Sequence, residues 1–499
     1  MTRKELLDAI AHGDVSRVAA MLPPDTLLDP VVNRVLNPVQ GTTPLYLAAV
    51  DGAHEIVRLL LDHGADPDHV SGGECEGLPL CAAASWDHAE TVQALLDGGA
   101  DPDVREDGGW TALLWAASNG NLASADILLD SEAGPDLAND DGDTPLTLAA
   151  RFGAYGLVWS LLDHGADPAL PGSGGATALE IATRWAAVDL ETAIREEVTT
   201  QATADHTIIT AKTHASDGTQ RVTVEARNAD GGGYGITRQY GHAAIATSLE
   251  VAMGIRPSAQ ELLRRALPYR DLDEDDETWW AAVHALQRRH DDETFEAAAR
   301  LCDSDDPLER EFGVDVLADF GYDADRRPYR ERSLPLLRDM AAQECDPEVV
   351  ESILHALGHH ADQRALAEVL DIVNRPGRTP TVNDPMALAA VLPPDHDEGL
   401  ATLIRLSESP DAEVRDWATM GLASLAADTP PIRDALAERL ADSDLTTVAE
   451  AAQGLAARGD RRAIDGVHRV LCEAGHDQDY ARDLALEAAR ELGLEISGA

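Results

Sequence analysis

The sequence predicts a mainly α-helical fold in which two α-solenoids are joined by a small α+β junction with a β-hairpin. Three observations predict it: a helical pattern that recurs about every 33 residues, β-branched runs between 206 and 228, and Ala- and Leu-rich helical runs from about residue 257. Aromatic residues make up only 4% of the 499 residues, which favours helices over a β-sandwich. We expect three parts: 1–198, 199–256 and 257–499.

The first part contains five copies of one pattern, aligned on triplets such as Thr-Pro-Leu. The anchors follow one another at a nearly constant spacing: Pro44, Pro79, Ala112, Pro145 and Ala178. A Thr just before the anchor can cap a helix, and Pro is tolerated in a first helical turn. Each copy predicts an Ala-rich inner helix and a Leu-rich outer helix. Three glycines stand where the outer helix must end in a left-handed residue: Gly64, Gly99 and Gly165.

These copies closely resemble the ankyrin repeat. The resemblance covers 41–198, with a degenerate capping unit at 6–22 and an irregular insertion at 22–40. It implies a linear stack of helix pairs with a concave groove that binds protein. In the ankyrin pattern, the residue before the capping Thr and the two residues after Ala-Ala face this groove.

Four of the chain's twelve Trp and Phe residues fall on the fifteen groove positions. Exposed aromatic rings are typical binding anchors, and adjacent arginines can form cation–π contacts or pair with carboxylates. The alternative is that some rings pack over a neighbouring repeat or under the 22–40 insertion. Trp115, which replaces a core Leu, is interpreted as structural. The predicted partner-binding residues are Asp51, Trp86, Trp110, Asn119, Asp143, Arg151, Phe152, Arg184 and Trp185.

The middle part changes from helical to β-branched composition. Runs at 206–215 and 220–228 predict two strands around a tight turn, and the sequence leaves a third strand at 234–239 open. The Gly-rich segment 230–235 lacks the spacing of a phosphate-binding loop and predicts a turn. A helix is expected at 242–254.

From about residue 257 the pattern is helical again and resembles short bacterial HEAT-like repeats. Asp306-Pro307 and Asp346-Pro347 each predict a helix start, and Gly459-Asp460 predicts a helix end. The Pro-rich segment 375–385 is expected to be a long loop between repeats.

The net charge disfavours one broad class of function. The chain has 90 acidic and 39 basic residues and a formal net charge of −51, which disfavours ordinary binding of DNA or RNA. The acidity is also consistent with solubility or salt adaptation. Five cysteines without a CxxC motif, no apolar run long enough to cross a bilayer and no signal-peptide pattern predict a cytoplasmic protein that does not enter membranes.

No catalytic motif is evident. Glu351, His355 and His359 are spaced so that one face of a helix could present all three side chains to a metal. The favoured interpretation is the end of an ordinary helix, with His near its C-terminus. The acidic segment 271–277 lacks the glycine and glutamate of a calcium loop, so an acidic linker is favoured. We therefore predict no catalytic residue, no metal and no cofactor.

The favoured function is a non-enzymatic protein–protein interaction scaffold that binds a protein partner through the concave groove, and the acidic surface favours a basic partner. One alternative is an acidic inhibitor or immunity protein that mimics nucleic acid. Another is a HEAT-like nucleic-acid enzyme, which the net charge disfavours. The oligomeric state stays open.

Overall fold

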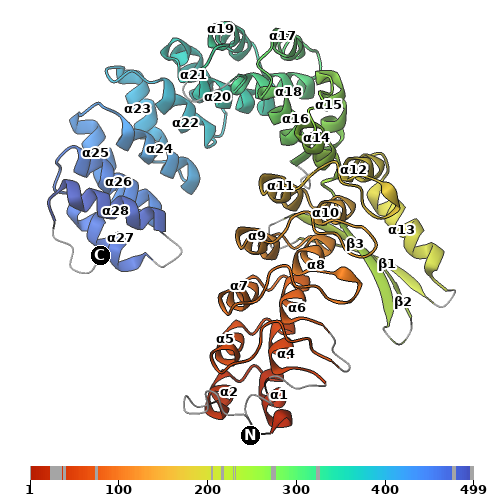
Figure 1. The fold of residues 1–499 in the computed structure, drawn as a ribbon. Helices are drawn as coiled ribbons and strands as arrows, with labels where there is room; N and C mark the ends of the chain where they lie inside the picture. The colour runs from red at the N-terminus through yellow and green to blue at the C-terminus, as the bar shows by residue number, and fades with distance from the viewer. Residues whose placement is uncertain are drawn as a thin grey trace. The chain divides into compact units, whose positions relative to one another are not determined.

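The computed structural model (Figure 1) describes most of the chain. The described residues are 2–22, 36, 41–72, 77–203, 206–214, 219–228, 230, 232–270, 277–321, 326–474 and 479–494. The predicted insertion at 22–40 and acidic linker at 271–277 therefore lie almost entirely outside them. The chain forms two compact units, Met1–Ala285 and Leu286–Ala499. The predicted fold class is confirmed, because helices dominate and a three-stranded sheet separates two helical regions.

The first unit is a stack of helix pairs. The inner helices each pack on the next one: α1 (Arg3–Ala11), α4 (Pro44–Val50), α6 (Pro79–Ser85), α8 (Ala112–Asn119), α10 (Pro145–Phe152), α12 (Ala178–Ala186) and α14 (His242–Ala252). The outer helices form a second layer: α2 (Val15–Met21), α5 (His54–Asp62), α7 (Ala89–Asp97), α9 (Leu122–Asp130) and α11 (Tyr155–Asp163). One hydrophobic core runs through both layers.

The helix boundaries follow the predicted capping residues. The Thr43 hydroxyl accepts a hydrogen bond from the Tyr46 amide at 3.1 Å, and Thr111, Thr144 and Thr177 cap their helices in the same way. Past the outer helices, the predicted glycines have left-handed φ angles of 86–92°: Gly64, Gly99 and Gly165.

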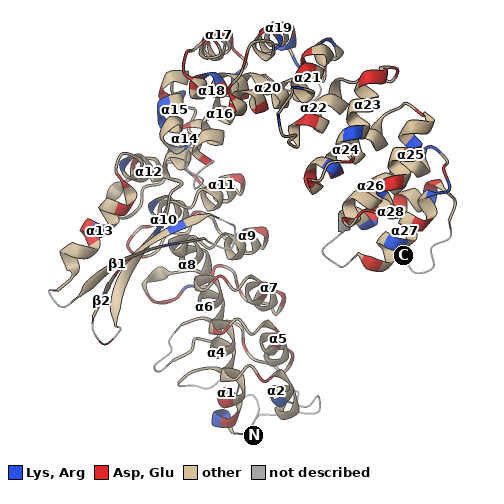
Figure 2. Cartoon of the chain, turned by 180° about the vertical axis from the view of Figure 1, so that it is seen from behind, with Lys and Arg blue, Asp and Glu red and all other residues tan. Residues whose placement is uncertain are grey.

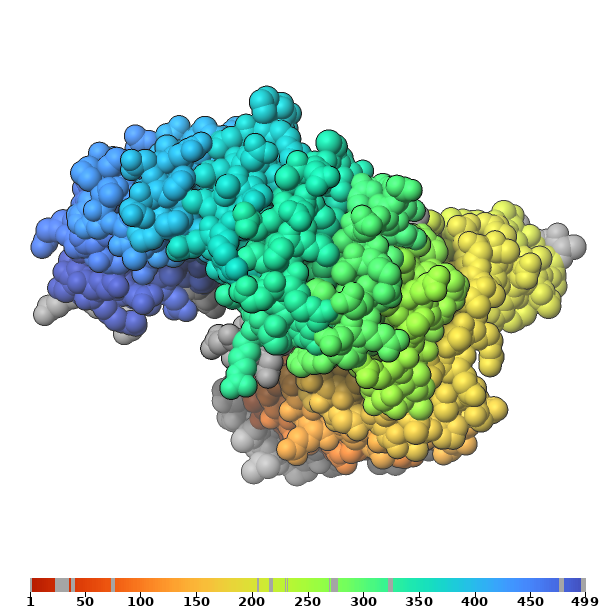
Figure 3. Space-filling model, turned by 90° about the horizontal axis from the view of Figure 1, so that it is seen from above, coloured from red at the N-terminus to blue at the C-terminus, as the bar shows by residue number. Residues whose placement is uncertain are grey.

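The sheet consists of β1 (Thr207–His214), β2 (Gln220–Arg227) and β3 (Gly233–Gln239), antiparallel in the order β1-β2-β3. The third strand is therefore confirmed, whereas the predicted turn at 230–235 lies partly outside the described residues. Alternate residues of β2 are buried against α13 (Leu190–Gln201): Val222, Val224 and Ala226. Figure 3 shows α13 and the sheet, in yellow, as a lobe that projects to one side of the repeats.

Helices α15 (Ala259–Ala266) and α16 (Glu277–Gln287) follow α14. The second unit then stacks inner helices in succession: α18 (Pro307–Ala318), α20 (Pro347–His360), α22 (Asn383–Val391), α24 (Ala412–Ser424), α26 (Leu445–Ala457) and α28 (Asp479–Glu491). The outer helices alternate with them: α17 (Asp292–Leu301), α19 (Arg330–Ala341), α21 (Leu366–Val373), α23 (Asp397–Leu406), α25 (Pro430–Arg439) and α27 (Ala463–Glu473). The helix starts at Pro307 and Pro347 are confirmed. The Pro-rich segment 375–385 is a loop up to α22, which takes its last three residues.

Candidate functional site

The residues predicted to bind a partner lie mainly along one side of the ankyrin stack. We call this side the inner face, formed by α4, α6, α8, α10 and α12 with the residues that precede them. We call the seventh residue after each anchor the helix-end position. This residue is the last residue of an inner helix or directly follows it, except in the last repeat, where it lies in the final turn of the helix. The helix-end positions are occupied by Asp51, Trp86, Asn119, Phe152 and Trp185. Their recurrence lets one repeat be compared directly with another.

Trp86 is the exposed aromatic residue of this set. Its residue is 66% exposed, the largest value among the exposed large hydrophobic residues of the described chain. Asp51, at the helix-end position of the preceding repeat, is exposed as well. An indole left in water is typical of a surface that another molecule covers.

Trp110 lies before the next inner helix and forms a ring pair with Trp115, with centroids 4.4 Å apart and planes tilted by 30°. Both rings are partly buried against the repeat core, as predicted for Trp115. The Trp115 Nε1–H donates to a Glu106 carboxylate oxygen at 2.9 Å, and the other oxygen of Glu106 accepts from the Leu78 amide. The pair is therefore held in place and presents a fixed indole surface.

Asn119 and Arg184 have different environments. The Asn119 amide Nδ2 donates to the Ser85 carbonyl at 3.3 Å and the Trp115 carbonyl at 3.2 Å, so Asn119 links two repeats. Arg184 is exposed. Asn119 thus has a structural role within the stack, while the role of Arg184 in binding stays a prediction.

The expected exposure of Asp143 and Phe152 is wrong. Phe152 is only 5% exposed and Asp143 only 6%. Asp143 accepts two hydrogen bonds from the Arg151 guanidinium, at 2.9 and 3.2 Å, and one from the Ser173 amide. Burial alone would raise the pKa of Asp143, but the hydrogen bonds from Arg151 and Ser173 lower it below its ordinary value. These contacts link Asp143, which lies before α10, to Arg151 in the last turn of α10 and to Ser173 in the loop before α12, while the role of Arg151 in binding stays a prediction.

Phe152 is buried because its ring packs against Gly120 of the preceding repeat and because the chain's own sheet covers it. Arg221 of β2 lies over the Phe152 ring at 5.7 Å from its centroid. The same guanidinium donates to the Gly120 carbonyl oxygen at 2.9 Å, at the end of the preceding inner helix. The sheet therefore rests on the inner face through an arginine that contacts two adjacent repeats.

Trp185 is covered by the same region of the chain. Arg238 of β3 lies 5.8 Å from the Trp185 ring centroid, and the ring of His242 stacks on Trp185 at 5.7 Å. Burial lowers the pKa of His242 to about 4, so this imidazole is neutral at pH 7. Of the aromatic rings at helix-end positions, those of Phe152 and Trp185 are thus occupied by arginines of the sheet.

Sequence reasoning missed these contacts and one further exposed ring. Trp159, on the outer helix α11, is 55% exposed. Its neighbours Leu157, Val158, Leu161 and Leu162 are buried or half-buried, so helical periodicity places Trp159 on the opposite face. No sequence signal indicates that Arg221 docks on Phe152, far earlier in the chain, because that contact is purely tertiary.

The Glu351, His355 and His359 side chains are engaged with other groups. Glu351 pairs with Arg378 and accepts from the Thr381 hydroxyl at 2.6 Å. The His359 Nδ1 lies 2.8 Å from an Asp319 carboxylate oxygen, and the His355 and His359 rings are 4.2 Å apart. Among the described residues, no group of three or more His, Cys, Asp or Glu side chains is placed to hold a metal ion.

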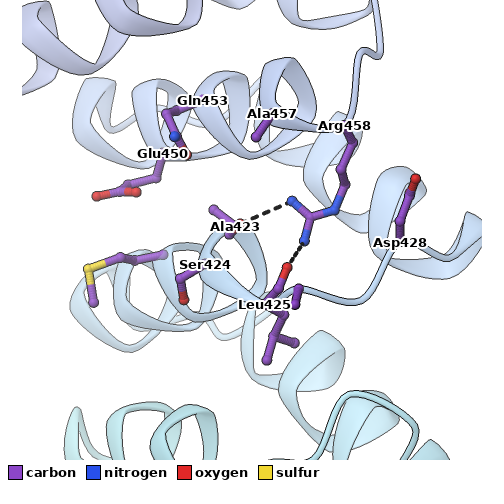
Figure 4. Close-up of a pocket in the computed structure, with 10 residues that line it drawn as sticks. Ala423, Ser424, Leu425, Asp428, Glu450, Gln453, Ala457 and Arg458 are labelled. Atoms are coloured by element: carbon purple, nitrogen blue, oxygen red, sulfur yellow. Dashed lines mark hydrogen bonds between the residues drawn. The ribbon is translucent and has the colours of Figure 1, made fainter. Parts of the chain in front are cut away.

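The second unit contains a cavity of about 500 Å³ between α24 and α26 (Figure 4). Glu450 and Gln453 of α26 lie opposite Ser424 of α24. Burial raises the pKa of Glu450, although the Tyr480 hydroxyl donates to it. Arg458 donates to backbone carbonyl oxygens at the end of α24, including those of Leu422, Ala423 and Leu425. These contacts hold the end of α24.

Comparison with known proteins agrees with the geometry of the first unit. Three overlapping segments match the family of ankyrin repeats (3 copies): residues 6–106, 80–172 and 113–190. No curated protein matches the chain in sequence. None of the described helices combines the length and the apolar character that crossing a membrane requires. Residues 6–190 of this chain are therefore ankyrin repeats.

Proposed function

We propose that this protein is a non-enzymatic interaction scaffold that binds a protein partner on the open part of the ankyrin inner face. Ankyrin repeats generally mediate protein–protein interactions. The observation that carries the proposal for this chain is Trp86, an indole that is 66% exposed at the end of an inner helix. Burying such a ring releases a large apolar area from water, which is why Trp is frequent among binding hot spots.

The neighbouring repeats provide further support. The Trp110–Trp115 pair presents a second, rigid indole surface on the same inner face. Rigid aromatic groups lose little conformational entropy when a partner binds. A partner segment that follows the inner face would therefore meet an exposed ring, an exposed carboxylate at Asp51 and a preformed ring pair.

Charge favours a basic partner. The segment 41–119, which spans the first three repeats, contains many Asp and Glu but only two basic side chains, Arg58 and Arg105. Figure 2 shows Asp and Glu along the helices and loops of these repeats, with few Lys or Arg. An acidic surface of this kind speeds the encounter with a basic partner and disfavours acidic ones.

Two of the described cysteines, Cys81 and Cys302, are buried and are not candidate nucleophiles. Burial raises the pKa of the Cys81 thiol well above its ordinary value and that of the Cys302 thiol to about 12. Because the thiolate is the reactive form, these two thiols stay protonated and unreactive at neutral pH.

The second unit supplies a second solenoid, which we propose to be HEAT-like. Equivalent arginines link its repeats. Arg310 of α18 donates to the Ser304 carbonyl at 3.0 Å and pairs with Glu344, ahead of the next inner helix. Arg415 of α24 donates to the Ser409 carbonyl at 2.9 Å and pairs with Asp442 in the same way. This repeated contact supports a regular stack of hairpins, which is typical of scaffolds.

The proposal is tested by capturing partners from the native host with the full-length chain and with variants. We expect Trp86→Ala combined with Trp110→Ala to reduce capture of a specific partner by tenfold or more, in the range of about 2 kcal/mol for hot spots. Trp159→Ala is the matched control, because it removes an equally large, exposed indole from an outer helix. Capture that survives the double substitution, or that depends on Trp159, would contradict the proposal.

The same experiment separates the scaffold from an acidic mimic of nucleic acid, a candidate that the net charge of −51 supports. Binding by a mimic depends on many carboxylates and weakens steeply with salt. We expect capture to depend more strongly on the two indoles than on salt. A partner that is released by salt alone and is indifferent to the indole substitutions would instead support the mimic.

A further inference from the structure

At the helix-end positions, an exposed aromatic ring can be compared with aromatic rings that are covered by arginine side chains. Among the aromatic members, Phe152 and Trp185 each lie under a guanidinium of the chain's own sheet, at 5.7 and 5.8 Å from the ring centroids. Trp86 has the same position in its repeat and is 66% exposed. In the described part of the chain, no guanidinium lies over the Trp86 ring.

We infer that Trp86 is the binding position for an arginine side chain of the protein partner, an inference that rests on the function proposed above. We expect this arginine to belong to an extended segment of the partner, because Arg221, which covers Phe152, belongs to the extended strand β2. A flat guanidinium can stack on an indole, which is the strongest of the aromatic partners for cations.

The backbone around Trp86 repeats the geometry around Phe152. Arg221 over Phe152 also donates to the carbonyl of Gly120, which is the eighth residue after the anchor of the preceding repeat. The eighth residue in the repeat before Trp86 is Gly52. Both glycines have left-handed φ angles, 66° for Gly120 and 67° for Gly52. The backbone conformation is therefore shared, whereas the adjoining rings differ, because His88 packs against Gly52 and Phe152 packs against Gly120.

The residue before Gly52 is better suited to bind a cation than the residue before Gly120. Asp51 precedes Gly52 and is exposed, whereas the neutral Asn119 precedes Gly120 and bonds to Ser85 and Trp115. A carboxylate can accept two parallel N–H bonds from a guanidinium, which a Lys ammonium cannot offer. The excess of acidic residues across 41–119 adds a long-range attraction.

The test uses the full-length protein and three labelled peptides that differ at one residue. The probe is fluorescein-Gly-Thr-Arg-Thr-Val-Thr-Gly, with Lys or the neutral isostere citrulline in place of Arg. Binding is measured by fluorescence anisotropy. We expect the Arg peptide to bind about 3- to 30-fold more tightly than the citrulline peptide, with the Lys peptide between them.

Variants assign the site. Trp86→Ala should remove the preference for Arg, Trp86→Phe should retain part of it, and Asp51→Asn should weaken Arg binding several-fold and reduce its salt dependence. Trp159→Ala should change nothing. Equal affinity for the Arg and citrulline peptides, no detectable Arg-peptide binding, or an unchanged preference in Trp86→Ala would overturn the inference.

Two outcomes separate this inference from the proposed function. If partner capture falls with the indole substitutions but the peptides show no Arg preference, the scaffold stands and the guanidinium position fails. If Trp86→Ala instead converts a dimer to a monomer in analytical ultracentrifugation, the occupant is a second copy of this chain and the proposed partner is wrong.

Discussion

Gly153 and Gly165 offer a matched pair of substitutions that tests whether the sheet is docked on the ankyrin repeats. Both glycines follow helices and have nearly identical φ angles, 87° and 86°. A Cβ at Gly165 would meet nothing within 4 Å. A Cβ at Gly153 would lie less than 3.0 Å from the Gln239 carbonyl oxygen at the end of β3 and from the His242 ring.

The two variants share one cost and differ in another. An alanine in the left-handed region costs about 1–2 kcal/mol at either position. Gly153→Ala adds a steric clash with strand backbone, which cannot rotate away as a side chain can. Comparable overpacking costs about 1–3 kcal/mol, and here it acts on the contact between β3 and α10. The difference between the variants therefore reports the docking of the sheet.

Hydrogen–deuterium exchange measures this difference locally, which matters because unfolding of a two-unit chain need not be two-state. We expect the amides of β3 to exchange about 5- to 150-fold faster in Gly153→Ala than in Gly165→Ala, which corresponds to about 1–3 kcal/mol of opening free energy. Equal exchange of residues 233–239 in the two variants would refute the docked sheet.

Three further predictions concern individual side chains. Arg221→Ala removes the hydrogen bond to Gly120 and the ring contact, so we expect faster exchange in β2 by about tenfold and increased accessibility of the inner face; exchange like that of the wild type would contradict it. The pKa of His242 is lowered to about 4, so its stabilising effect is complete above about pH 6.5 and lost as pH falls through 4, by about 3 kcal/mol in total. Exchange of α14 measured from pH 7 to 4 should show this loss, and His242→Phe should abolish it. Arg458→Ala leaves carbonyls at the end of α24 without their donor and should destabilise the second unit by about 2–4 kcal/mol in urea unfolding; a change below about 0.5 kcal/mol would contradict this role.

The repeat period predicted most of the architecture. The nearly constant spacing located the anchors, and with them the capping threonines and the left-handed glycines such as Gly64, because these features are local to one repeat. The strands were predictable from β-branched runs, and the structure confirms the third strand that the sequence left open.

The environment of each candidate residue was less predictable than its position. The pattern correctly places Trp86 and Phe152 at equivalent positions, yet one is exposed and the other buried. The difference arises from a sheet that docks on repeats three to five and leaves the second repeat open. A repeat pattern gives the place of a side chain within its repeat, whereas a distant segment of chain decides whether water reaches it.

Site-specific photocrosslinking tests the central claim most directly. A photoreactive phenylalanine analogue is placed at position 86, on the ankyrin inner face, or at position 159, on the outer helix α11, in the full-length protein in its native host. Both native indoles are more than half exposed, so both positions are accessible to a partner. We predict a discrete adduct with one protein from position 86 and none from position 159. Adducts from position 159 alone, or the same adducts from both positions, would contradict binding at the inner face.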